Sequence, residues 1–112
     1  MKRVEAIIRP DKFDVVKDAL LELGYPGMTV TMVTGHGTQK GISQVWHGRR
    51  FRIDLLSKIK IEITVRDIDV DNIVDTIINV SQTGSIGDGK IFVYHVENVY
   101  RVRTNESGEI AI

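Results

Sequence analysis

The chain of 112 residues is long enough for one domain and too short for two independent cores. Its 15 Lys and Arg residues balance its 15 Asp and Glu residues, which argues against a general nucleic-acid binder, and the absence of cysteine excludes disulfides and cysteine-based metal or nucleophile chemistry. Because no apolar run approaches the roughly 18 residues of a membrane span and no signal peptide is evident, we expect a cytoplasmic protein.

The first third of the chain predicts a strand, a helix and a second strand. Val and Ile dominate residues 4–9, as is typical of a strand. Asp11 is placed to cap a helix that ends at Gly24. The apolar stripe of this helix has helical spacing and consists of Phe13, Val16, Leu20 and Leu23. A second strand is expected over residues 28–33.

Residues 34–56 break this regular pattern. They show neither strand nor helix periodicity, and glycine and basic residues are frequent among them. We therefore expect a long loop, and a loop of this length inside a compact domain is usually functional or mobile.

The second half of the chain begins with a strand and a helix. Residues 59–65 alternate strictly between Ile or Val and polar residues, which predicts a half-buried strand. Asp67 or Asp69 is placed to cap a second helix, which Gly84 is expected to end. The apolar stripe of this helix consists of Val70, Ile73, Val74, Ile77 and Ile78.

The remaining segment predicts one more core strand and a weakly structured tail. Residues 91–96 are apolar on both faces, residues 100–103 predict a short strand extension, and the tail after Thr104 is expected to be mobile. The order β-α-β-β-α-β is the split βαβ pattern of an α+β fold, in which an antiparallel sheet carries both helices on one face. Phe92 and Tyr94 make the other face partly apolar, which suggests self-association.

The strongest local signal for a ligand is the turn at residues 84–90, Gly-Ser-Ile-Gly-Asp-Gly-Lys. It resembles the start of a P-loop, but Ile91 stands where that motif needs a hydroxyl, and the turn follows a helix instead of a strand. Its glycines still allow backbone N–H groups to converge on an anion, with Lys90 as a point charge. The alternative is a helix C-cap followed by a simple glycine turn.

Other candidate ligand groups flank the long loop. Residues 35–41 are a second glycine-rich segment, either a ligand loop or a hinge, in which Gln39 offers an amide oxygen to a metal. Lys58, at the other end of the loop, is a candidate partner for a carboxylate. Arg101 and Arg103 lie two apart on the expected strand, so both should point to one face, either to clamp phosphate oxygens or as a solvated edge.

The tip of the loop combines basic and aromatic side chains. This cluster consists of Trp46, His47, Arg49, Arg50, Phe51 and Arg52. Its composition suits either RNA or a docking loop for a protein partner.

Taken together, these residues resemble the PII family of nitrogen-regulatory signal proteins. Residues 83–93 look like the family's C-terminal signature, and residues 27–31 and 37–41 look like its second strand and its T-loop entrance. Residues 60–63 and 101–104 match as well. These separate motifs occur in the order and at the spacing of the family along the whole chain.

The resemblance implies a compact homotrimer of ferredoxin-like subunits, each with a four-stranded antiparallel sheet. The chain would be a single PII-type domain with a T-loop at residues 37–55, a phosphate-binding B-loop at residues 82–90, and a C-terminal loop and tail at residues 101–112. ATP or ADP would bind between neighbouring subunits, with Arg101 and Arg103 reaching in from the adjacent chain.

The resemblance also assigns ligand residues. The nucleotide would contact Ile7, Thr29, Gly35, Gly37, Thr38, Gln39, Glu62, Ile63, Thr64, Gly87, Asp88, Gly89, Lys90, Arg101 and Arg103. The adenine would lie near Ile7, Thr29 and residues 62–64. The effector 2-oxoglutarate would contact Gly37, Gln39, Lys40, Gly41, Lys58 and Gly87. Its distal carboxylate would pair with Lys58, and Mg²⁺ would be held by the ATP phosphates, 2-oxoglutarate and Gln39.

These ligands imply a non-enzymatic sensor of nitrogen, carbon and energy status. ATP with 2-oxoglutarate would favour one T-loop shape and ADP another, so that partners bind only one of them. The partner would be a protein such as an ammonium transporter or a nitrogen-assimilation enzyme. No nucleic-acid partner is expected, and a membrane would be reached only through a transporter.

Several positions depart from the family pattern. Phe51 stands where uridylylated members carry Tyr, so no such modification is expected there, and Arg49 stands where another branch carries a phosphorylated Ser. His47 occupies the position of the Arg that plugs an ammonium channel in many members. Thr38 replaces an Arg that would help to hold a terminal phosphate, which leaves the preference between ATP and ADP open.

Other function classes remain as alternatives. A slow ATPase would need a base to position water, and no such group stands out. An RNA-binding module would need the aromatic, glycine-rich RNP pattern, which is absent from the sequence. A trimer of this fold could also sense adenylates alone, or another small ligand, without 2-oxoglutarate.

Overall fold

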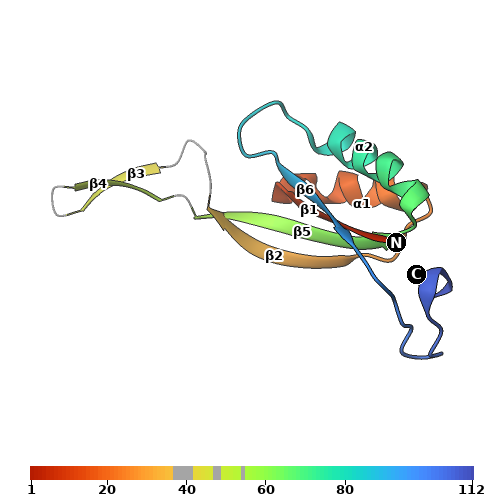
Figure 1. Ribbon diagram of the computed structural model, residues 1–112. Helices are drawn as coiled ribbons and strands as arrows, with labels where there is room; N and C mark the ends of the chain where they lie inside the picture. The colour runs from red at the N-terminus through yellow and green to blue at the C-terminus, as the bar shows by residue number, and fades with distance from the viewer. Residues whose placement is uncertain (37–41, 47–48, 54) are drawn as a thin grey trace.

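The computed structural model describes residues 1–36, 42–46, 49–53 and 55–112 (Figure 1). Its strands are β1 (Lys2–Ile8), β2 (Thr29–His36), β3 (Ile42–Trp46), β4 (Arg49–Ile53), β5 (Leu55–Val65) and β6 (Gly89–His95). Its α-helices are α1 (Phe13–Glu22) and α2 (Val70–Ser81). Short 3-10 helices are η1 (Pro10–Lys12), η2 (Asp67–Asp69) and η3 (Gly108–Ala111).

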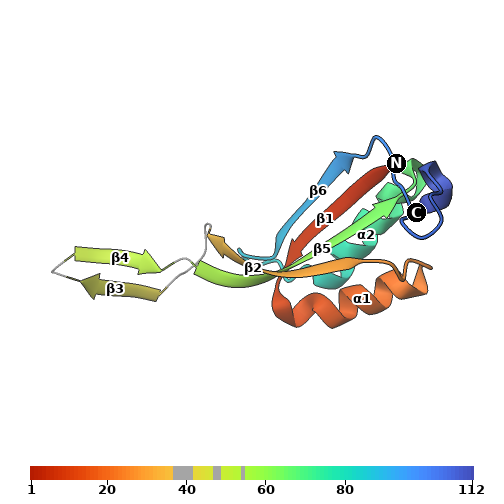
Figure 2. The same cartoon turned by 90° about the horizontal axis from the view of Figure 1, so that it is seen from below.

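Four strands form one antiparallel sheet in the order β2-β5-β1-β6. In its centre, Val4 of β1 lies opposite Ile63 of β5 and opposite Val93 of β6. Both helices cover the same face of this sheet (Figures 1 and 2). The α+β, ferredoxin-like arrangement expected from the element order is therefore confirmed. Neither α-helix of the described residues is long and apolar enough to cross a membrane.

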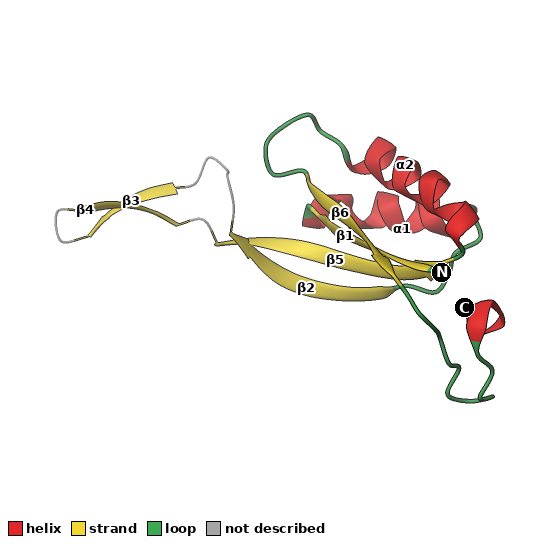
Figure 3. Cartoon of the chain, viewed as in Figure 1, coloured by secondary structure: helices red, strands yellow, loops and turns green. Residues whose placement is uncertain are grey.

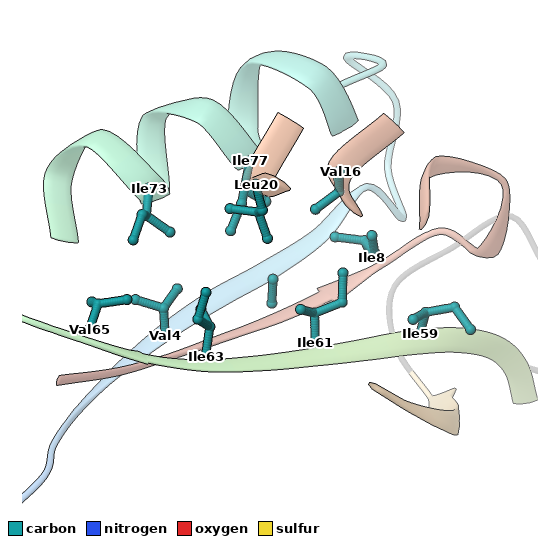
Figure 4. Close-up of a cluster of buried hydrophobic side chains, with 11 residues drawn as sticks. Val4, Ile8, Val16, Leu20, Ile59, Ile61, Ile63, Val65, Ile73 and Ile77 are labelled. Atoms are coloured by element: carbon teal, nitrogen blue, oxygen red, sulfur yellow. The ribbon is translucent and has the colours of Figure 1, made fainter. Parts of the chain in front are cut away.

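Strict alternation places every second side chain of β1 and β5 in the core. Along β5, the buried positions alternate with half-buried ones, as the pattern of residues 59–65 predicts. The apolar stripes of α1 and α2 close this core from the helix side (Figure 4). Its buried members are Val4, Ala6, Ile8, Val16, Leu20, Ile59, Ile61, Ile63, Val65, Ile73 and Ile77. Burial of each Val, Leu or Ile side chain contributes about 1.5–3 kcal/mol, so this cluster dominates the stabilisation of the fold.

Helix α1 ends at the glycine stop that the sequence predicts. Gly24 has φ +90°, a conformation that residues with a Cβ rarely adopt. The amide of Tyr25 donates to the Leu20 carbonyl at 3.0 Å, and the amide of Gly24 donates to the Leu21 carbonyl at 2.9 Å. These two bonds form a Schellman motif and satisfy the last carbonyls of the helix.

The other helix ends differ from the expectation. Asp11 lies inside η1, and Asp69 occupies the N-cap position of α2 without a side-chain cap bond. The carboxylate of Asp69 instead accepts from Arg66 Nε at 3.1 Å, and Asp67 pairs with Lys2. The 3-10 turns that precede both helices satisfy backbone donors by their own carbonyls, which removes the need for a capping side chain. At its C-terminal end α2 stops at Ser81, before Gly84.

The segment expected as an irregular loop contains regular structure. Strand β2 continues to His36, β5 begins at Leu55, and β3 and β4 pair as a separate two-stranded sheet, with Ile42 opposite Ile53. These two strands belong to a sheet of their own, and their sequence lacks the apolar alternation that predicts the strand at residues 59–65.

The expectations for the C-terminal segment are also wrong. Residues 102–104 form a turn instead of a strand, and Tyr100 pairs with Ser107 in an isolated bridge. Asn105, at φ +58°, donates its amide to the Arg101 carbonyl at 2.8 Å. Helix η3 follows, so this tail is folded (Figure 3). The tail is held by backbone hydrogen bonds, by hydrogen bonds to the side chains of Asn98, Arg101 and Thr104, and by one ion pair. These polar contacts leave no apolar period in the sequence.

The sheet face opposite the helices, here called the open face, is mixed in character. Phe92 and Tyr94 are each 41% exposed there, as expected from the two apolar faces of β6. Charged groups lie beside them: the Tyr94 hydroxyl donates to Glu5 at 2.9 Å, and Lys60 pairs with Glu5 at 3.7 Å and with Glu62 at 3.4 Å. The hydrogen bond to Glu5 raises the pKa of Tyr94. The face therefore combines apolar rings with matched charges.

Candidate functional site

The glycine-rich turn connects α2 to β6 at one end of the sheet (Figure 1). Gly84, Gly87 and Gly89 all have positive φ, between +86° and +106°. At Gly89 the requirement is also steric, since a Cβ atom there would lie 1.8 Å from the carbonyl oxygen of Ile7. The glycines thus allow the chain to turn tightly and to approach β1 without a side chain between them.

Asp88 holds this turn together from within. Its Oδ2 accepts the backbone amides of Thr83 at 2.8 Å and Gly84 at 2.9 Å. Its Oδ1 accepts the Thr83 hydroxyl and Arg9 Nε, the latter at 3.0 Å. These donors favour the ionised carboxylate, the Thr83 hydroxyl most strongly, and hold the pKa of Asp88 well below its usual range.

Lys58 lies beside this turn and contacts it. Its Nζ donates to the Gly87 carbonyl at 2.5 Å. A Cβ atom built on Gly35 would contact the aliphatic stem of Lys58 at 3.4 Å, so β2 also approaches the lysine closely. Partial burial, followed by the charge of Arg9, lowers the pKa of Lys58. The structure thus brings together three residues predicted as ligand contacts: Gly35, Lys58 and Gly87.

Lys90 and Ile7 complete the group at this end of the sheet. They lie opposite each other in the β1–β6 register. Asp88, Gly89 and Lys90 also line a cavity of about 370 Å³ between α2 and β6. The predicted phosphate contacts are therefore neighbours in the structure.

A second group of predicted residues lies at the opposite end of the sheet. Thr29, Glu62, Ile63 and Thr64 line one cavity of about 450 Å³. Ile63 belongs to the core, whereas Glu62 and Thr64 alternate with it on the open face. The cavity also contains residues that sequence reasoning missed, namely Arg3, Gly27, Met28, Val99, Ala111 and Ile112. The last of these belong to the C-terminal segment, whose folding the sequence pattern does not reveal.

The two groups are separated within one chain. Ile7 lies opposite Lys60, whereas Arg3 lies opposite Thr64. These positions are four residues apart along β1, or about 13 Å at the rise of a strand. Ile7 therefore does not join Thr29 and Thr64 around one adenine within a single subunit.

The predicted arginine pair does not share a strand face. Arg101 Nη1 forms an ion pair with Glu106 at 2.9 Å, and Arg101 Nη2 donates to the Ile110 carbonyl at 3.0 Å. Arg103 lies in the following turn and is exposed. Within this chain Arg101 thus stabilises the folded C-terminal segment, while Arg103 faces solvent.

The remaining predicted residues lie outside the described part of the structure. These are the loop residues Gly37, Thr38, Gln39, Lys40, Gly41 and His47, together with the side chains of Trp46, Arg49, Arg50, Phe51 and Arg52. Their roles stay predictions.

Comparison with known proteins gives the family. A family model described as nitrogen regulatory protein P-II matches residues 1–106. The chain is 56% identical over 112 residues to nitrogen regulatory protein P-II 2 of Methanothermobacter thermautotrophicus, an alignment that covers all of this chain and 97% of the relative. It is 54% identical over 112 residues, with both chains covered in full, to nitrogen regulatory protein P-II of Klebsiella oxytoca and to P-II 1 of Escherichia coli strain K12. The resemblance carried by the sequence motifs is thereby confirmed, and the chain belongs to the P-II family of nitrogen regulatory proteins.

Proposed function

We propose that this nitrogen regulatory protein is a non-enzymatic, cytoplasmic sensor of adenine nucleotides and 2-oxoglutarate. It binds ATP or ADP between the subunits of a homotrimer, and it binds 2-oxoglutarate together with Mg-ATP. The ligands control the T-loop, residues 37–55, which contacts a target protein such as an ammonium transporter or a nitrogen-assimilation enzyme.

The separation of the two residue groups is the observation that carries this proposal. One group, around Gly87 and Lys90, has the chemistry of a phosphate site. The other, around Thr29 and Thr64, lines a cavity at the far end of the same sheet. A nucleotide bound between two copies would take its phosphate contacts from one subunit and its base contacts from the next. Both groups of residues would then contact one nucleotide, although they lie far apart within a single chain.

The open face favours assembly of such copies. Phe92 and Tyr94 expose their rings there, and the charges beside them are already matched within the chain. Contact between two such faces removes apolar surface from water without leaving an unpaired charge.

The chemistry of the phosphate turn supports an anionic ligand. Gly84, Gly87 and Gly89 have positive φ angles, a backbone conformation that is common in anion-binding turns, and Lys90 is exposed beside them. The single carboxylate of the turn, Asp88, is held by donors within the chain. Its negative charge is therefore balanced before a phosphate arrives.

Lys58 supports a second, carboxylate-bearing ligand. Its ammonium is partly desolvated and touches the Gly87 carbonyl, so it lies next to the phosphate turn. A ligand carboxylate that pairs with Lys58 replaces or shares this bond. Effector and nucleotide are then linked through neighbouring groups, and each changes the affinity for the other.

Isothermal titration calorimetry tests the proposal. Wild-type protein should bind ATP and ADP, and should bind 2-oxoglutarate only in the presence of Mg-ATP. Lys58→Ala should lose 2-oxoglutarate binding and retain ATP binding. Lys17→Ala is the matched control, because within the described part of the chain Lys17 pairs with exposed carboxylates on α1, at 3.7 Å from Asp14 and 3.9 Å from Asp18.

The possible results separate the alternatives. Nucleotide binding without 2-oxoglutarate binding in the wild type would leave a sensor of adenylates alone. Failure to bind any adenine nucleotide would refute the proposal as a whole. Steady ATP turnover well above the buffer rate would show an enzyme instead.

A further inference from the structure

Arg9 contacts the phosphate turn from a distant part of the chain. Its Nε donates to Asp88 Oδ1 at 3.0 Å, and its Nη2 donates to the Ile86 carbonyl at 2.9 Å. The residues of the first contact are 79 positions apart. Arg9 was not among the residues that the sequence motifs single out, because nothing in its local pattern distinguishes it from an arginine at the end of a strand.

The backbone at Arg9 is held firmly. Arg9 follows β1, one of the two inner strands, and its extended conformation, φ −62° and ψ 141°, is the one that Pro10 favours in the residue before it. The Arg9 carbonyl accepts the amide of Lys12 at 3.0 Å. The guanidinium therefore projects from a rigid platform at the edge of the core.

The turn itself has few other anchors. Residues 82–88 form no helix or strand, and their positive-φ glycines give the backbone wide conformational freedom. The Asp88 bonds to Thr83 and Gly84 close the turn on itself but do not attach it to the sheet. Its described side-chain contacts with the sheet are those of Arg9, the residue after β1, and of Lys58 in β5.

The two contacts of Arg9 fix different parts of the turn. One orients the Asp88 carboxylate, which in turn holds the amides at the start of the turn. The other fixes the Ile86 carbonyl, and so the direction of the peptide that leads to Gly87. A planar guanidinium can hold both groups at once, whereas an ammonium on a flexible stem offers no such fixed geometry.

We propose that Arg9 is a positioning residue for anion binding: it holds the 83–88 turn in its binding conformation through Asp88 and Ile86 and does not itself contact the anion. This inference rests on the proposed function, in that the anion is the phosphate chain of an adenine nucleotide. It predicts that Arg9 affects the binding of phosphate groups much more than the binding of the nucleoside.

The test compares Arg9→Met with Arg66→Met. Arg66 is the matched control, because its Nε also donates to an aspartate, Asp69 at 3.1 Å, but at a site away from the turn. The first measurement is amide hydrogen exchange without nucleotide. Arg9→Met should speed exchange at Gly84 and its neighbours in the turn and leave the core strands unchanged, whereas Arg66→Met should not alter the turn.

The second measurement is calorimetric affinity for ADP and for adenosine. Loss of charge-assisted hydrogen bonds that order a binding turn typically weakens binding about tenfold or more. Arg9→Met should weaken ADP by that factor with little change for adenosine, and Arg9→Lys should recover only part of the loss. In an Asp88→Asn background, Arg9→Met should have much less additional effect, because Arg9 acts through Asp88.

Each result bears on the inference. Unchanged exchange and unchanged ADP affinity in Arg9→Met would overturn it. Equal losses for ADP and adenosine would show a general disturbance of the fold, and full additivity with Asp88→Asn would show that Arg9 does not act through Asp88; either result also overturns the inference. If the wild type binds no adenine nucleotide, the proposed function fails, and the exchange experiment alone decides whether Arg9 holds the turn.

Discussion

Replacing Gly89 by alanine should cost far more stability than the same replacement at Gly24. The two glycines have similar positive φ angles, +106° and +90°. Placing a Cβ in the left-handed region costs about 1–2 kcal/mol at either position. At Gly24 nothing lies within 4 Å of the added Cβ, so this conformational cost stands alone.

At Gly89 the added Cβ would overlap the backbone of the neighbouring strand β1. It would lie 1.8 Å from the Ile7 carbonyl oxygen and 2.8 Å from the Ile7 carbonyl carbon, where real contacts stay above 3.0 Å. Because both atoms belong to the backbone of β1, no side-chain rotation relieves the overlap. The end of β6 must move away by more than about 1 Å and lose its first ladder bonds, each worth about 1 kcal/mol. We expect a total loss of about 3 kcal/mol or more for Gly89→Ala, against about 1 kcal/mol for Gly24→Ala.

Urea denaturation of both variants and the wild type measures this difference. All three should be compared at one protein concentration, since assembly adds a concentration-dependent term to apparent stability. Both substitutions reduce the entropy of the unfolded chain alike, so this contribution cancels between them. Equal losses for the two variants would refute the steric argument and would mean that β1 and β6 separate easily at this end.

Two further predictions concern the turn and the open face. The native pKa of Asp88 lies below the value of about 3.9 for an unfolded chain, so its ionised form contributes stability above about pH 4, and this contribution is lost as the pH falls toward the native pKa. The urea midpoints of wild type and Asp88→Asn should therefore differ by a constant amount above about pH 5 and converge below pH 4; a gap that persists into acid would contradict the assignment. Phe92→Glu should shift the protein to a smaller species in light scattering after size exclusion, because it places a charge on the open face, while Ile68→Glu, at a position 79% exposed in η2, should leave the assembly intact. An unchanged mass for Phe92→Glu would show that the open face is not the contact between subunits.

Strong local periodicity explains which parts of the fold could be predicted. The alternation of residues 59–65 and the apolar stripes of both helices depend on burial in the core. Both patterns therefore predict the strand and the helices that the structure contains. The β3–β4 pair and the C-terminal segment depend on contacts that leave no such period. Arg101 illustrates the second case, since its ion pair with Glu106 and its bond to Ile110 fold the tail without any apolar pattern.

The candidate site was predicted by type of residue more than by geometry. The glycines and Lys90 identify the turn in the sequence, because they are close neighbours along the chain. Arg9 acts across the fold and has no local signature, so only the structure places it against Asp88. The division of the predicted ligand residues between two ends of the sheet likewise depends on strand register, which the sequence pattern alone does not specify.

The arrangement around Asp88 has a consequence for metal coordination. An ionised carboxylate offers about four lone-pair positions, and Asp88 directs two of them at backbone amides, one at the Thr83 hydroxyl and one at Arg9. All of these lone-pair positions are therefore occupied by donors within the protein. A divalent cation that arrives with a nucleotide must complete its oxygen shell from phosphates, water or other side chains. The carboxylate of Asp88 thus serves the architecture of the turn, and under the proposed function a cation would take other ligands.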